Sequence, residues 1–137
     1  MVKKITKNDL AILREHKQRM DGLHRAIADL RASVTDTSVH LSDMPRSGQY
    51  HDAFAEFVAK KEAIEIRLMQ VEALYMEKYA DVEEGIMFLP FAQQKVIRMR
   101  YEKAMSWREI SQNAHYAKSY CKTLHRKALE RLDPDPE

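Results

Sequence analysis

Residues 106–132 read SWREISQNAHYAKSYCKTLHRKALERL, and they contain the signals that begin and end two consecutive helices. Ser106, with Glu109 three residues later, forms a capping box, which predicts a helix over residues 107–114. A two-residue turn follows, and a second helix is expected over residues 117–132. A short capped helix, a tight turn and a longer helix are typical of a helix-turn-helix unit.

The apolar residues of this stretch define the inward side of both predicted helices. They are Trp107, Ile110 and Ala114 in the first helix, Tyr116 in the turn, and Cys121, Leu124, Ala128, Leu129 and Leu132 in the second. The opposite side of the second helix presents hydrogen-bond donors, most of them cationic. These donors are Lys118, Ser119, Lys122, Thr123 and Arg126. Because the N-terminal part of a recognition helix enters the major groove, they predict contact with double-stranded DNA.

The individual donors suit different parts of a duplex. We expect Lys118 and Lys122 to reach base edges, and Arg126 to position the helix. Tyr120 is expected either to contact phosphate or to pack beneath the first helix. The candidate DNA-binding residues are Arg108, His115, Lys118, Ser119, Tyr120, Lys122, Thr123 and Arg126. A basic surface helix in an ordinary helical bundle is the alternative interpretation.

Composition favours an all-helical protein whose charge is unevenly distributed. Three Gly and four Pro among 137 residues are too few turn residues for a β-rich fold. The net charge of +2 hides an asymmetry: residues 52–84 carry four Lys or Arg and nine Asp or Glu, whereas residues 95–132 carry ten and three. Such a basic segment is either a phosphate-facing surface or a solvated helix.

Two long helices are predicted before the basic segment. The first begins at a cap formed by Thr6 or Asn8. Apolar residues recur three and four positions apart over residues 13–34, and again over 54–78, which indicates the seam of a coiled coil or helical hairpin. Residues 33–50, rich in Ser, Thr and Asp, predict a long connection between the two.

The chain therefore divides at the end of the second long helix. Gly85 is expected to end or kink that helix. Pro90 is expected to begin the next, a short helix with Arg98 and Arg100 exposed. The predicted organisation is a helical arm over residues 1–84, a helix-turn-helix domain over 85–132 and a disordered tail over 133–137.

Several motifs of the C-terminal segment together carry a family resemblance. They are Leu89-Pro90, the helix ending in Arg100-Tyr101, the run Ser106-Trp107-Arg108-Glu109-Ile110, and the closing Arg126-Lys127-Ala128-Leu129-Glu130-Arg131-Leu132. This pattern resembles region four of the bacterial housekeeping-type sigma factors. It is more similar still to the sigma-like phage transcriptional regulators of the ArpU/RinA type, which have a helical N-terminal arm and a connection like residues 42–48.

The resemblance implies a phage or prophage transcriptional regulator whose recognition helix reads a promoter-like element. It implies a homo-oligomer, a dimer in the simplest case, formed through the helices within residues 8–80, or contact of these helices with RNA polymerase. The family usually has Gly in the turn where this chain has His115. The turn therefore either differs slightly or keeps His115 for a phosphate contact. Without the other sigma regions, we expect no promoter melting.

No catalytic set stands out in the sequence, so we expect no enzyme activity, metal or other cofactor. The six His residues form no recognised metal motif. His40 and His51, with Asp43 and Asp52, flank the predicted connection, and exposed polar residues explain them better than a metal site. Cys121 is the single cysteine, which excludes an internal disulfide and a Cys-rich zinc site.

Two other functions remain open at this point. A DNA-packaging protein similar to a small terminase subunit would form rings, and a protein-interaction module would bind a basic partner through its acidic helix. No apolar run approaches the roughly 20 residues of a membrane span, and the N-terminus lacks an apolar signal region. We therefore expect a protein of the bacterial host cytoplasm, associated with the nucleoid, without a membrane partner.

Overall fold

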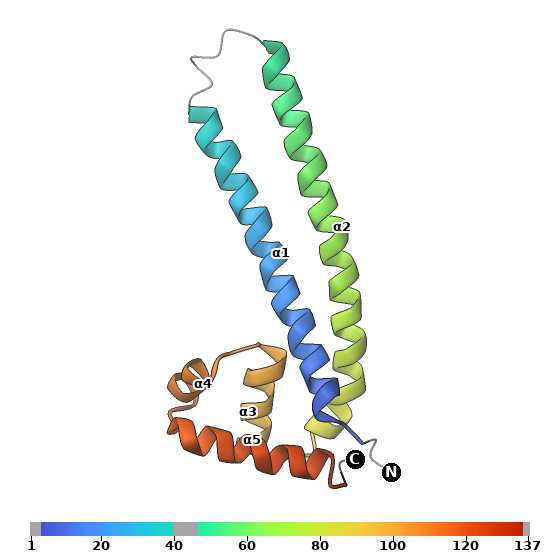
Figure 1. Ribbon diagram of the computed structural model, residues 1–137, viewed down its shortest axis with the longest axis vertical. Helices are drawn as coiled ribbons and strands as arrows, with labels where there is room; N and C mark the ends of the chain where they lie inside the picture. The colour runs from blue at the N-terminus through green and yellow to red at the C-terminus, as the bar shows by residue number, and fades with distance from the viewer. Residues whose placement is uncertain (1–3, 40–46, 136–137) are drawn as a thin grey trace. The chain divides into compact units, whose positions relative to one another are not determined.

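The computed structural model describes residues 4–39 and 47–135, and helices are the regular elements found in these ranges (Figure 1). In chain order they are α1 (Lys7–Val39), α2 (Ser47–Ile86), α3 (Phe91–Ile97), the π-helical turn η2 (Arg98–Glu102), α4 (Trp107–Ala114) and α5 (Lys118–Leu132). The prediction of an all-α fold, in which long helices precede a C-terminal helix-turn-helix unit, is confirmed.

The long helices extend into the segment predicted as a connection. α1 continues to Val39 and α2 already begins at Ser47, so residues 33–39 and 47–50 are helical. Ser and Thr lower helix propensity by less than about 0.7 kcal/mol per residue, which does not stop an established helix from propagating. The remainder of the predicted connection, with His40 and Asp43, lies outside the described residues.

The chain folds into two compact units. We call Met1–Gln18 with Ala73–Glu137 the head, and Arg19–Glu72 the arm. Both α1 and α2 contribute to each unit. The boundary predicted at residue 85 therefore lies inside the head, which includes the first turns of α1 and the last turns of α2.

Within the arm, α1 and α2 run in opposite directions (Figure 1). Ala26 and Leu30 of α1 lie across a shallow surface hollow from Ala63 and Ile64 of α2. The predicted seam is the less exposed side of each helix, and Leu68 is buried.

Large apolar side chains of the arm also face solvent. Phe54, predicted as a seam residue, is 56% exposed. Ile66 and Met69 are 58% and 68% exposed. Ile66 is two residues from both Ile64 and Leu68, so it lies on the opposite side of α2 from the seam.

The main core of the head combines residues from both ends of the chain. Its buried members are Ile5, Leu10, Leu13, Val82, Ile86, Leu89, Ile97, Tyr101, Ala128 and Leu132. Full burial of one large aliphatic side chain stabilises a fold by about 1.5–3 kcal/mol. Residues 5–13 therefore contribute substantially to a domain that the sequence predicted to begin at residue 85.

A reciprocal cap fixes the start of α1 inside the head. Thr6 Oγ1 accepts a hydrogen bond from the Asp9 backbone N–H at 3.1 Å, and Asp9 Oδ2 accepts one from the Thr6 N–H at 3.0 Å. Asp9 also forms an ion pair with Lys78 of α2 at 3.1 Å. The bond from the Thr6 backbone, with smaller contributions from Lys78, lowers the pKa of Asp9. Of the two predicted caps, Thr6 is the one formed.

Gly85 permits a close approach between three segments of the head. A Cβ at this position would overlap Ile5 Cδ1 and lie 3.3 Å from Leu132 Cδ2. α2 continues through Gly85 to Ile86, and no described glycine has a positive φ. α2 thus ends one residue after Gly85, close to the predicted end, but Gly85 is not a left-handed cap and has a packing role instead.

Candidate nucleic-acid interface

The first helix of the helix-turn-helix unit begins as the sequence predicts. Ser106 Oγ accepts a hydrogen bond from the Glu109 N–H at 3.2 Å, and Glu109 Oε1 accepts one from the Ser106 N–H at 3.3 Å. The capping box is therefore complete, and α4 covers the predicted residues. Because the box satisfies two backbone donors, it fixes where α4 starts.

The turn between α4 and α5 is left-handed at His115. This residue has φ 60° and ψ 34°, and its side chain is exposed. The turn is tightened by a bond from Ser111 Oγ to the Tyr116 carbonyl at 2.6 Å. A left-handed conformation costs a residue other than Gly about 1–2 kcal/mol. The turn thus places an imidazole-bearing residue in a conformation that Gly adopts most readily.

The inward stripe predicted for the two helices is confirmed. Ile110 and Cys121 are fully buried with Val96 and Leu124 in a second core cluster, against which Tyr116 packs. Burial also raises the pKa of the Cys121 thiol. This packing fixes the rotation of α5 about its axis, and with it the direction of the outward side chains.

Most of the predicted donors lie on the open side of α5. The exposed ones are Lys118, Ser119, Tyr120, Lys122 and Arg126, and Arg108 of α4 is exposed as well. Thr123 is half-buried and donates its hydroxyl to the Ser119 carbonyl at 3.1 Å. Arg126 pairs with Glu130 at 2.9 Å, but both side chains are 63% exposed. Such an exposed pair contributes little to stability.

Tyr120 takes part in packing at the edge of the donor surface. Its ring meets that of Tyr116 edge to face at a centroid distance of 5.1 Å, yet 47% of the residue remains exposed. The Tyr120 ring therefore packs against the turn, and part of the ring remains accessible to solvent beside Ser119.

Residues 86–133 match the model of the family Sigma-70, region 4. The match covers less than half of the chain, so it assigns the C-terminal domain and not the whole protein. No curated protein and no solved structure matches the chain. The helix-turn-helix unit thus belongs to a sigma region 4 domain, whereas the likeness to ArpU/RinA regulators stays a prediction.

Two arginines that were predicted to be exposed instead stabilise the region 4 domain through contacts with other parts of the head. Arg98 donates from both terminal nitrogens to the Glu83 carboxylate at 2.7 Å, and also pairs with Glu102 at 2.5 Å. These bonds raise the pKa of Arg98 and lower that of Glu83. Arg98 therefore fastens η2 to α2, and the prediction that it is exposed is wrong.

Arg100 holds the segment before α4 in a similar way. Its guanidinium lies 4.7 Å from the centre of the Trp107 ring and donates to the Met105 carbonyl at 3.1 Å. Its own carbonyl accepts a bond from Arg14 Nε of α1 at 3.1 Å. Arg100 is half-buried, so the prediction of exposure is wrong here too. Sequence periodicity missed both arginines because Glu83 and Trp107, which they contact, lie on other elements.

His125 connects the recognition helix to the rest of the region 4 domain. Its Nε2 lies 2.6 Å from the Tyr101 hydroxyl, its ring stacks on Tyr101, and it meets Trp107 edge to face at 5.0 Å. Burial, with smaller effects from Lys7 and Arg100, lowers the pKa of His125 to about 4. The imidazole is therefore neutral at physiological pH and serves as a packed, hydrogen-bonded positioning group.

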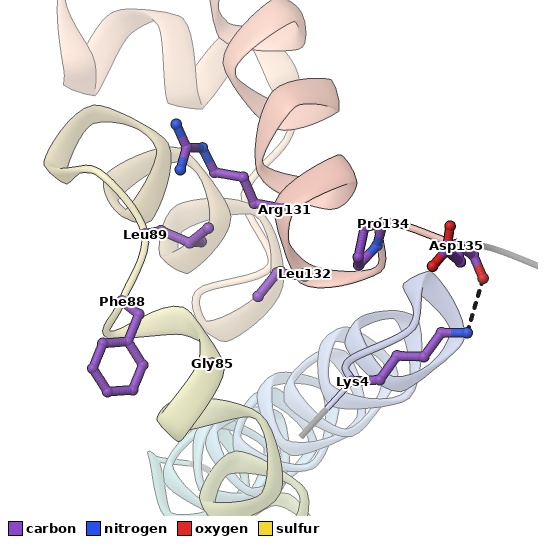
Figure 2. A pocket seen from close by; sticks show the side chains of 8 residues that line it. All are labelled: Lys4, Gly85, Phe88, Leu89, Arg131, Leu132, Pro134 and Asp135. Carbon is purple, nitrogen blue, oxygen red and sulfur yellow. Dashed lines mark hydrogen bonds between the residues drawn. The ribbon is translucent and has the colours of Figure 1, made fainter. Parts of the chain in front are cut away.

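A second surface feature of the head lies at the C-terminal end of α5 (Figure 2). This hollow is lined by Lys4, Gly85, Phe88, Leu89, Arg131, Leu132, Pro134 and Asp135. Lys4 Nζ donates to the Asp135 carbonyl at 2.9 Å.

Across residues 4–39 and 47–135, no three His, Cys, Asp or Glu side chains gather as a metal site would require. The same ranges contain no helix long and apolar enough to cross a membrane.

Proposed function

We propose that the protein is a sequence-specific transcriptional regulator of phage or prophage type that binds double-stranded DNA through α4 and α5. The observation that carries this proposal is the exposed row of Lys118, Lys122 and Arg126 along the open side of α5. A capped α4 and a left-handed turn hold that helix in a fixed orientation. On this proposal the protein acts by binding rather than by catalysis.

The donor row fits the two tasks of a DNA-binding helix. Lys118 and Lys122 lie in the first turns of α5, the part that enters a major groove, where Lys reads guanine O6 and N7. Arg126, one turn further, suits a phosphate, because it can exchange Glu130 for a stronger anionic partner. Arg108 at the start of α4 lies where the first helix of such units meets the DNA backbone.

The test is binding to duplexes selected from a random pool, measured by fluorescence anisotropy at several salt concentrations. Changing Lys122 and Arg126 together to Ala should weaken binding and reduce the slope of log K against log salt by at least about one unit, the share of the Arg126 phosphate contact. Lys60→Ala, in the arm, is the matched control and should leave the slope unchanged. An unaltered slope in the double variant would mean that a different face meets DNA.

The proposal includes a homodimer formed through the arm. Ile66 and Met69 support it, because they expose apolar surface on the side of α2 that the seam does not use. A contiguous exposed apolar patch is typical of a protein-protein interaction site. Replacing both by Gln should turn a dimer into a monomer in sedimentation equilibrium. A ring of eight or more subunits would instead favour a DNA-packaging protein, and a monomer in the unaltered protein would favour RNA polymerase as the partner of the arm.

A further inference from the structure

The segment before α1 is fixed along the C-terminal end of the recognition helix. The Ile5 N–H donates to the Leu132 carbonyl at 3.2 Å, and the Ile5 side chain is buried. Lys4 Nζ lies 3.2 Å from Asp133 Oδ1 and donates to the Asp135 carbonyl. These contacts place the next residues of the chain beside α5, although they lie outside the segment that matches region 4.

Lys7, the first residue of α1, occupies this position with its side chain exposed. It shares a surface hollow with Arg126, Leu129 and Glu130 of α5. Its charge also contributes to the lowered pKa of His125, which agrees with a location close to α5. Lys7 is therefore a cation that α1 adds to the side of the recognition helix.

In the unbound protein, the carboxylates that share the hollow with Lys7, and that of Asp9 in the first turn of α1, have other partners. Glu130 pairs with Arg126, Asp133 with Lys4, and Asp9 with Lys78. Among the described residues, none forms a hydrogen bond or ion pair with the Lys7 side chain. Its ammonium group therefore keeps an unneutralised charge available to an external anion.

The place of Lys7 in its own helix adds nothing to stability. A positive charge in the first turn opposes the helix dipole, because the free N–H groups there already carry partial positive charge. Lys4 and Arg126 are further cations in the same area. A residue that is electrostatically unfavourable in the isolated protein, and that remains exposed, is suited to a ligand of opposite charge.

Lys7 also continues the row of cations on α5. With a rise of 1.5 Å per residue, Leu129 lies about 10 Å beyond Lys122 along the helix. A major groove is about 12 Å wide, so the far end of a helix seated in it approaches the sugar-phosphate backbone at the edge of the groove. Lys7, beside Leu129, lies on that end.

We propose that Lys7 is a DNA-phosphate contact contributed by α1, which extends the region 4 interface beyond the residues of the region 4 domain itself. This inference rests on the proposed function. Its ligand is the DNA backbone, so it adds affinity and salt dependence without sequence preference.

The test compares Lys7→Gln with the unaltered protein in duplex binding as a function of salt. Loss of one phosphate contact removes about 0.9 units of slope. The affinity ratio between about 50 and 200 mM salt should therefore shrink by about 3.5-fold. Thermal unfolding of the variant should occur at the same or a higher temperature, since a charge opposed to the helix dipole has been removed. Lys7→Arg keeps the charge and should keep the slope, and Lys60→Gln is the control outside the head.

The outcomes separate this inference from the proposed function. If Lys7→Gln keeps the original slope while Arg126→Gln loses a unit, the inference is wrong and the proposed function stands. If Lys7→Gln lowers the unfolding temperature and Lys7→Arg does not restore binding, Lys7 is structural and the inference is again wrong. If the unaltered protein binds no duplex at low salt, the proposed function and this inference both fail.

Discussion

Replacing Gly85 by Ala should destabilise the head, although Ala is the better helix former. The gain in helix propensity is at most about 1 kcal/mol. The added Cβ, however, overlaps Ile5 Cδ1 and comes within 3.3 Å of Leu132 Cδ2. Ile5 cannot easily move aside, because its side chain is buried and its N–H is bonded to Leu132. Overpacking of this kind costs about 1–3 kcal/mol, so we expect a net loss of about 1–2 kcal/mol in the free energy of unfolding.

Gly22→Ala provides the matched control. Gly22 lies within α1 in the arm, and a Cβ there meets no heavy atom within 4 Å. Helix propensity then acts alone, and the change should stabilise the protein by about 0.5–1 kcal/mol. Urea unfolding followed by far-UV circular dichroism measures both variants. Fluorescence of Trp107, the single tryptophan, reports on the head separately.

A double variant tests the cause directly. Ile5→Val removes Cδ1, the atom that the new Cβ overlaps. Combined with Gly85→Ala, it should destabilise the head by less than the sum of the two single changes, with a coupling of about 0.5–1.5 kcal/mol. Additive effects, or a Gly85→Ala variant as stable as the original, would refute the packing role assigned to Gly85.

Other predictions follow from the turn, the interface and the buried imidazole. His115 and Ala104 both have a positive φ, so His115→Gly and Ala104→Gly should each raise stability by about 1 kcal/mol in urea unfolding. If His115 contacts phosphate, His115→Gly will also reduce the salt slope of DNA binding, whereas Ala104→Gly will not. Lys118→Gln and Lys122→Gln should each relax base preference at one position of a selected site, as a repeated selection would show. His125 has a folded pKa of about 4, below its ordinary 6.5, so the unfolded state binds the proton first and stability should fall as pH drops from 6.5 to 4. A His125→Gln variant should show a flatter pH dependence in that window, and an unchanged profile would contradict the assignment.

The parts of the interface that could be predicted from sequence are those that depend on residues close together in the chain. The capping box at Ser106 and Glu109, the bounds of α4 and the inward stripe ending at Leu132 all depend on residues within one or two helical turns. Local spacing also gave the correct outward side of α5 for Lys122 and Arg126. Periodicity identifies the buried face of a helix when its apolar residues recur along one side.

The parts that could not be predicted depend on contacts between distant segments. Arg98 and Arg100 have the spacing of exposed residues, and contacts with the distant Glu83 and Trp107 help to make them half-buried. The contribution of residues 5–13 to the core was missed for the same reason, because nothing near Ile5 in the sequence identifies Leu132 as its partner. Helix bounds within 33–50 were missed because weak helix formers remain helical when they extend an existing helix.

The contact of Ile5 with Leu132 has a consequence for how the head folds during synthesis. Lys4 and Asp135, joined by a hydrogen bond, are 131 positions apart in the chain. The main core of the head is therefore incomplete until α5 has left the ribosome, whereas the helices of the arm need only each other. Contacts of such long range slow folding and leave apolar surface exposed in the meantime. Leu10 and Leu13 are buried completely only when α5 is present. A nascent chain halted before residue 128 should therefore have a folded arm and an incompletely folded head.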